Sequence, residues 1–144
     1  MSGAQRLYTP QLLALAVELA RVPPLDRATS HGEARSPTCG STLAIDLITD
    51  KTGRIERLGL RVRACAVGQA AAAIFARHAA GRDRTDLAQS LAGLESWLSG
   101  GSVMPDWPDL AIIAAARAYP ARHGAMLLPW RAAVAALSSV PARG

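Results

Sequence analysis

The sequence contains little cysteine, few aromatic residues and no long apolar run. Two cysteines, Cys39 and Cys65, stand among 144 residues, which excludes a disulfide framework and favours reduced thiols in a cytoplasmic setting. The most apolar window, ACAVGQAAAAIFA, is too short and too rich in alanine to span a bilayer. The opening MSGAQRLYTPQ lacks the basic segment and apolar core of a secretory leader. We therefore expect a cytoplasmic protein without membrane association.

Sequence signatures of catalysis are also missing. We find no serine, histidine and aspartate that assemble into a nucleophilic set, no glycine loop that would cradle a phosphate, and no paired carboxylates. The Gly100-Gly101 pair follows a predicted helix and is a stop signal, not a nucleotide motif. We therefore expect that the protein is not an enzyme.

The charge is strongly one-sided, because the net charge is +5 and the sequence pI is about 10.2. A basic balance of this kind can indicate nucleic-acid binding. Here the basic residues are spread along the whole chain, and aromatic residues make up only 4% of it. A solvated basic surface is the preferred interpretation, and no nucleic-acid partner is expected.

Apolar residues make up 50% of the sequence, and alanine, a strong helix former, dominates among them. The chain is long enough for one domain, which we place over 1–144. Thr9 can cap a first helix with Pro10 in its first turn, and Val22-Pro23-Pro24 ends that helix. Residues 25–38 read as irregular. Further helices are predicted over 67–80, after a Thr85 cap, over 110–118 and over 127–137, where Pro129 fits only in the first turn.

Two segments between these helices alternate between apolar and polar residues with a period of two, which predicts a β-hairpin. The turn residues Asp50-Lys51-Thr52-Gly53 lie between them. Their apolar faces match in only one register. That register pairs Leu43 with Val62, Ile45 with Leu60, and Leu47 with Leu58.

Extending this register places the two cysteines at one end of the hairpin. Residue 39 falls opposite 66 and residue 40 opposite 65, so the thiols lie about one strand spacing apart, roughly 5 Å. Cys65 also stands at the start of a helix, whose positive end stabilises a thiolate. Three interpretations remain open: a metal or sulfur site, small residues with only a packing role, and a reversible disulfide.

Three segments, PTCGS, ACAVGQAAAAIF and YPARHGAMLLPW, resemble the signature regions of the U-type iron–sulfur assembly scaffolds, the NifU N-terminal, IscU and SufU family. The SufU branch is the most similar. The resemblance implies an α+β fold, in which a small antiparallel sheet of two to three strands packs against several helices. It also implies a scaffold that receives sulfur from a cysteine desulfurase and passes a transient iron–sulfur cluster to recipient proteins. Zinc can occupy the same ligands.

The sequence departs from the family at two ligand positions. The family aspartate after the first cysteine is Ser41 here, and the third cysteine aligns with Ala125. His123 could supply a third ligand beside Cys39 and Cys65, and Arg122 could steady the thiolates. Two hypotheses follow. In the first, the chain binds iron and sulfur, or zinc, through Cys39 and Cys65, and a partner or a second copy completes the site. In the second, the chain is a divergent docking module that regulates a desulfurase without metal.

Overall fold

The protein has an α+β architecture built on a three-stranded antiparallel sheet, as predicted. The structure, a computed structural model, describes residues 7–138. In chain order its elements are α2 (Pro10–Glu18), η1 (Leu19–Arg21), β1 (Ser30–Arg35), β2 (Thr42–Thr49), β3 (Ile55–Arg63), α3 (Ala66–His78), α4 (Arg84–Leu98), η2 (Leu110–Ala118), η3 (Pro120–Arg122) and α5 (His123–Ser138).

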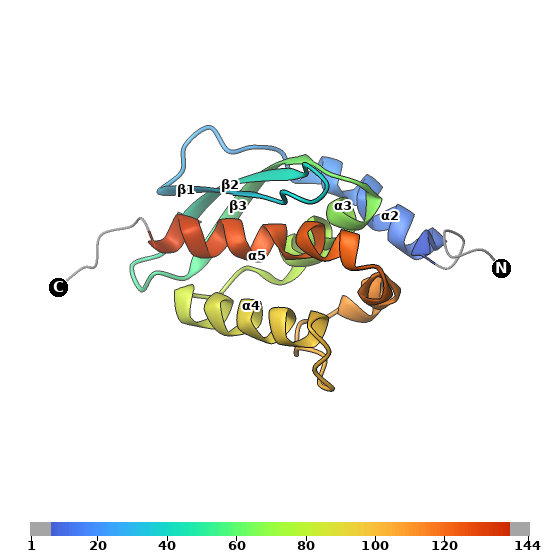
Figure 1. Cartoon of the computed structure of the whole chain (residues 1–144). Helices are drawn as coiled ribbons and strands as arrows, with labels where there is room; N and C mark the ends of the chain where they lie inside the picture. The colour runs from blue at the N-terminus through green and yellow to red at the C-terminus, as the bar shows by residue number, and fades with distance from the viewer. Residues whose placement is uncertain (1–6, 139–144) are drawn as a thin grey trace.

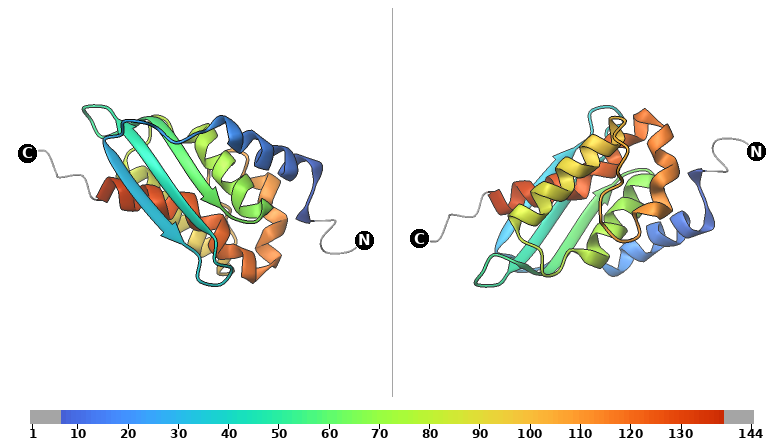
Figure 2. Two further views of the ribbon diagram at one scale, coloured as in Figure 1. Left: turned by 90° about the horizontal axis from the view of Figure 1, so that it is seen from above. Right: turned by 90° about the horizontal axis from the view of Figure 1, so that it is seen from below.

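The elements form layers with α5 in the middle. Helix α5 packs against β1 and β2 on one side and against α4 on the other, and α3 packs against both α5 and α2 (Figure 1). The opposite face of the sheet carries none of the described helices, as the view from above shows (Figure 2). Among the described residues, no helix combines the length and the apolar character that crossing a bilayer requires.

The predicted hairpin register is confirmed. Strands β2 and β3 pair with Leu43 opposite Val62, Ile45 opposite Leu60 and Leu47 opposite Leu58. The inward residues Leu43, Ile45 and Leu47 are each at most 1% exposed. Because these side chains must stay buried, a slip of the strand pairing by one residue would be costly. The register therefore also fixes the positions of the chain segments that carry Cys39 and Cys65, which continue from the ends of β2 and β3.

The prediction that residues 25–38 are irregular is wrong for Ser30–Arg35, which form the edge strand β1. This strand pairs antiparallel with β2. Gly32 lies directly against α5, since a Cβ atom built on it would overlap the carbonyl oxygen of Ala132 and approach the backbone nitrogen of Ala136 at 2.6 Å. The strand packs this closely because its inward positions carry small residues, and the same small residues gave no apolar alternation in the sequence.

Two predictions about helix starts need correction. Asp83, not Thr85, caps α4, and it forms a capping box with Asp86. Helix α5 begins at His123, four residues before the predicted start, so Pro129 lies inside the helix and not in its first turn. Proline has no N–H and cannot donate to the carbonyl group four residues earlier. That carbonyl group belongs to Ala125, at the start of α5.

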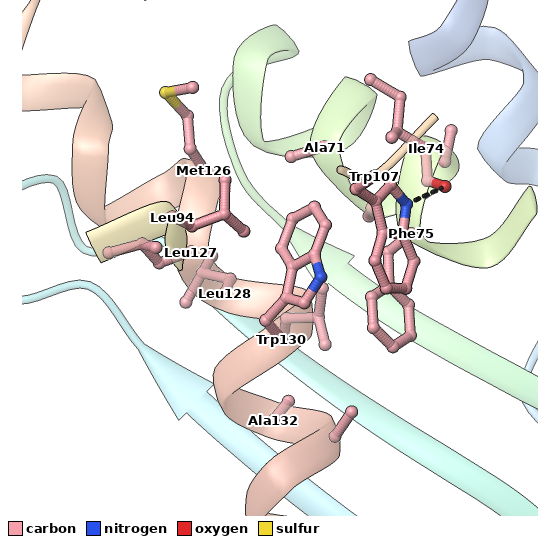
Figure 3. Packing of buried hydrophobic residues seen from close by; sticks show 14 of the residues in the cluster. Ala71, Ile74, Phe75, Leu94, Trp107, Met126, Leu127, Leu128, Trp130 and Ala132 are labelled. Carbon is pink, nitrogen blue, oxygen red and sulfur yellow. Dashed lines mark hydrogen bonds between the residues drawn. The ribbon is translucent and has the colours of Figure 1, made fainter. Parts of the chain in front are cut away.

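Large aromatic side chains join the helices in the core (Figure 3). Phe75 and Trp107 stack at 5.4 Å between ring centroids, and Trp130 meets both rings edge-on. Trp107 Nε1 donates to the Ile74 carbonyl oxygen at 3.2 Å. Within residues 7–138 the buried Nε1 of Trp130 has no hydrogen-bond partner, and it lies on the side of the indole facing Phe75 and Trp107 (Figure 3).

Candidate functional site

The turn between β1 and β2 presents Cys39 to solvent. Its ends are joined by hydrogen bonds from Ser36 N to Ser41 O and from Gly40 N to Ser36 O, both 2.8 Å. Gly40 adopts a φ of 71°, in the left-handed region that glycine tolerates best. The side chain of Cys39 is exposed, so this tightly closed turn holds a thiol where a partner can reach it.

Two serine hydroxyl groups flank the Cys39 thiol. Its Sγ lies 3.4 Å from Ser36 Oγ and 3.0 Å from Ser41 Oγ, and both serines are buried. Hydroxyl groups that donate to the thiolate lower the pKa of Cys39 below its ordinary value, Ser36 most and Ser41 next. The positive charge of Arg122 also lowers the pKa of Cys39, whereas the partial burial of the thiol raises it. The turn therefore favours the thiolate, which is the nucleophile and the metal ligand.

Cys65 occupies the N-cap position of α3, as the sequence predicted. It is half-buried and packs against the core. Its side chain forms no capping hydrogen bond. The segment is held instead by backbone contacts, since Cys65 O accepts from Gln69 N at 2.9 Å and Ala64 O accepts from Gln69 Nε2 at 2.9 Å. The sulfur is thus not committed to the helix terminus.

The first turn of α5 contacts both cysteine segments. A Cβ atom built on Gly124 would overlap Ser36 Oγ, the neighbour of Cys39. A Cβ atom built on Gly68, one turn after Cys65, would lie 3.3 Å from the Ala125 Cβ. Close approach at two glycines therefore brings the Cys39 turn and the start of α3 against the same short stretch of α5.

The two departures from the family pattern lie in this same place. Ala125, at the expected third-cysteine position, is completely buried and faces Gly68. Its methyl group offers no ligand atom. Ser41, at the expected aspartate position, is hydrogen-bonded to the Cys39 thiol. An aspartate at this position would instead offer a carboxylate oxygen to a metal.

His123 stands at the first position of α5, and its ligand role stays a prediction. Its Nε2 lies 2.7 Å from the Arg117 carbonyl oxygen. A carbonyl group only accepts, so Nε2 donates in this hydrogen bond, and in the neutral ring Nδ1 is the nitrogen with the free lone pair. An imidazole held in this tautomer by a backbone carbonyl group is a common arrangement among metal ligands.

Within residues 7–138, no three histidine, cysteine or acidic side chains form a preassembled cation site. Both cysteines are free thiols, and their ligand roles remain predictions along with that of His123. Sequence reasoning did not find Ser36, although the paired serines of SPTCGS that flank Cys39 were a visible signal.

Comparison with solved structures identifies similar folds over nearly the whole chain. The N-terminal NifU-like protein from Brucella abortus has a TM-score of 0.84 and 25% identity, over 96% of this chain and 97% of that one. A putative iron–sulfur cluster assembly scaffold protein for the SUF system from Fervidobacterium islandicum has a TM-score of 0.79 and 19% identity, over 92% and 97%. No protein-family model and no curated protein sequence matches the chain.

Proposed function

We propose that this chain, whose fold is similar to those of a NifU-like N-terminal protein and a SUF-system scaffold protein, is an iron–sulfur cluster assembly scaffold-like protein. Cys39 and Cys65 bind iron and sulfur, or zinc, as a cargo that is handed on. The observation that carries the proposal is the exposed Cys39 thiol, flanked by two buried hydroxyl groups on the turn beside α5. An exposed, thiolate-favouring cysteine is suited to transfer chemistry, whereas a structural cysteine is normally buried and inert.

Sulfur arrives at Cys39 by exchange with a persulfide of a cysteine desulfurase. The Cys39 thiolate attacks the terminal sulfur of the donor R–S–SH, a new sulfur–sulfur bond forms on Cys39, and the donor leaves as R–S⁻. No net oxidation or reduction accompanies this step. Ser36, Ser41 and Arg122 favour the attacking thiolate.

Cys65 supplies the second sulfur ligand, and Nδ1 of His123 supplies a nitrogen ligand. Three protein ligands leave a tetrahedral metal with one open position, which a recipient protein or a second copy of the chain fills during handover. A site without the aspartate and the third cysteine binds its cargo more weakly than a complete one. The chain performs no turnover of its own, and its setting is cytoplasmic.

A second function is favoured by the position of Ala125. The third ligand is replaced by a buried methyl group, and Ser41 is engaged with Cys39. A chain with these replacements could keep the surface that meets a desulfurase and regulate it without carrying metal. The two functions differ in one measurable property, the binding of iron or zinc by the isolated chain.

The test is anaerobic reconstitution of the full chain with iron and sulfide, followed by measurement of metal content and visible absorption. Under the scaffold proposal the chain acquires both signals, and Cys39→Ser and Cys65→Ser each abolish them. A chain that takes up neither iron nor zinc would support the docking module instead.

Two histidine variants test the third ligand. His123→Gln should lower the iron content, while His31→Gln, at an exposed histidine on β1, should leave it unchanged. Equal metal content in both variants would remove His123 from the ligand set and leave the two-cysteine site in place.

A further inference from the structure

The helix-free face of the sheet carries a hollow of about 460 Å³ next to the cysteine end. Its floor is formed by Thr42 and Ala44 of β2. The walls are longer side chains of the two neighbouring strands, Glu33 and Arg35 on β1 and Arg61 and Arg63 on β3. The register puts Arg35 and Arg63 on either side of Thr42, and Glu33 and Arg61 on either side of Ala44. We call this hollow the arginine groove.

The arginine groove is positively charged, and no described carboxylate forms an ion pair with its arginines. Arg35, Arg61 and Arg63 are exposed. Three guanidinium groups face the single carboxylate of Glu33, which leaves a net positive charge. Arginine presents a planar set of donors that matches a carboxylate. A partner that carries carboxylates would therefore complement the groove.

Part of the rest of this face is covered by the chain itself. The connector between η1 and β1 crosses it further along, where Leu25 N donates to Asp46 Oδ2 at 3.1 Å and Leu60 N donates to Val22 O at 3.3 Å. The open part therefore lies between this connector and the cysteine end of the sheet (Figure 2). Arg63 is two residues from Cys65 and Arg35 is four residues from Cys39, so the groove lies at the end of the sheet from which both cysteine segments continue.

We propose that the arginine groove binds an acidic polypeptide segment of the protein that exchanges sulfur or cargo with this chain. The inference rests on the proposed function for the identity of the partner, and on charge complementarity for the chemistry of the segment. A strand rises about 3.3 Å per residue, so the floor from Thr42 to Ala44 accommodates a few residues of an extended segment. Its carboxylates pair with the arginines of both walls and guide the partner toward Cys39.

The lining favours a carboxylate-bearing peptide over a nucleic acid. Single-stranded nucleic acid is held by aromatic side chains on which bases stack, and the groove has none. Glu33 would repel a continuous phosphate backbone, whereas a peptide can place a neutral residue beside it.

The probe is a fluorescent hexaglutamate peptide, titrated with the full chain at low salt and followed by anisotropy. Exposed ion pairs contribute modestly, about two- to threefold each, so Arg35→Gln, Arg61→Gln and Arg63→Gln together should weaken binding about tenfold. The matched control is Lys51→Gln, Arg54→Gln and Arg84→Gln, which removes the same charge from exposed positions at the opposite end of the sheet. Equal losses in both triple variants would overturn the proposal.

Glu33→Gln should have the opposite effect on peptide binding, because removing the one carboxylate of the groove should tighten binding about twofold. Weaker binding in this variant would contradict the proposal. A labelled single-stranded oligonucleotide that binds more tightly than the peptide, with the same arginine dependence, would also overturn it. Cys39→Ser should bind the peptide normally, so failure of the thiol chemistry and failure of the arginine groove are separate results.

Discussion

The contact between Gly32 and α5 can be tested by a single methyl group. Gly32→Ala places a Cβ atom into the carbonyl oxygen of Ala132 and at 2.6 Å from the backbone nitrogen of Ala136. Both obstacles are helix backbone, so no side-chain rotation relieves the overlap. Strand β1 or helix α5 must move, and the Cys39 turn moves with β1.

The magnitude follows from two opposing effects. Replacing glycine by alanine restricts the unfolded chain and stabilises the fold by about 0.4–1 kcal/mol where the site accepts it. Overpacking a closely packed contact costs about 1–3 kcal/mol, and more when backbone must move. We expect a net loss of about 2 kcal/mol, equivalent to a melting temperature lower by about 4–8 °C in a chain of this size.

Gly93→Ala is the matched control, because a Cβ atom built on Gly93 of α4 meets only the Pro105 side chain at 3.5 Å and beyond. It should raise stability by about 0.5–1 kcal/mol. Urea unfolding and thermal melting of both variants measure the difference. If Gly32→Ala is as stable as Gly93→Ala, the close packing of β1 on α5 is incorrect, and so is the placement of the cysteine turn.

Three further predictions concern the site and its surroundings. In a chain with Cys65→Ser, adding Ser41→Ala should slow alkylation of Cys39 at neutral pH, because a hydroxyl group that lowers the pKa of Cys39 is lost; an unchanged rate would exclude that role. The pKa of Asp109 is lowered chiefly by its hydrogen bond with His78. The ionised Asp109 therefore stabilises the folded state fully above the ordinary pKa of aspartate, and this stabilisation is lost as the pH falls through the lowered pKa. Asp109→Asn should therefore make unfolding less sensitive to acid, by about 1 kcal/mol or less because solvent screens the pair; an identical pH profile would contradict this. Ala125→Cys should raise iron content after reconstitution relative to Ala125→Ser, and equal content would place residue 125 outside the site.

Patterns of large apolar residues predicted the hairpin well. Leu43, Ile45 and Leu47 alternate strictly and must all be buried, which leaves only one register. Strand β1 was missed because its inward positions hold Ser30, Gly32 and Ala34. These small residues are required by the close approach of α5, and that approach is a tertiary property that no local pattern records.

The candidate site was predicted only in part, because some of its contacts also depend on tertiary packing. The position of Cys65 could be predicted from the start of α3, whereas the observed register ends with Thr42 opposite Arg63, so the proximity of the two thiols stays a prediction. The hydroxyl partners of Cys39 could not be predicted, because Ser36 joins the site through the closure of a turn and through contact with Gly124 of α5. Pro129 misled the prediction of the α5 start, since proline inside a helix is uncommon.

The central claim is that the fold holds the Cys39 and Cys65 thiols close enough to share one ligand. Phenylarsine oxide tests this directly, because its trivalent arsenic forms a stable adduct when two neighbouring thiols bind it together. Intact mass measurement of the reduced chain should show a single arsenical adduct that resists excess monothiol and disappears in both Cys39→Ser and Cys65→Ser. An unmodified wild-type chain, or an adduct that persists in either variant, would contradict the claim.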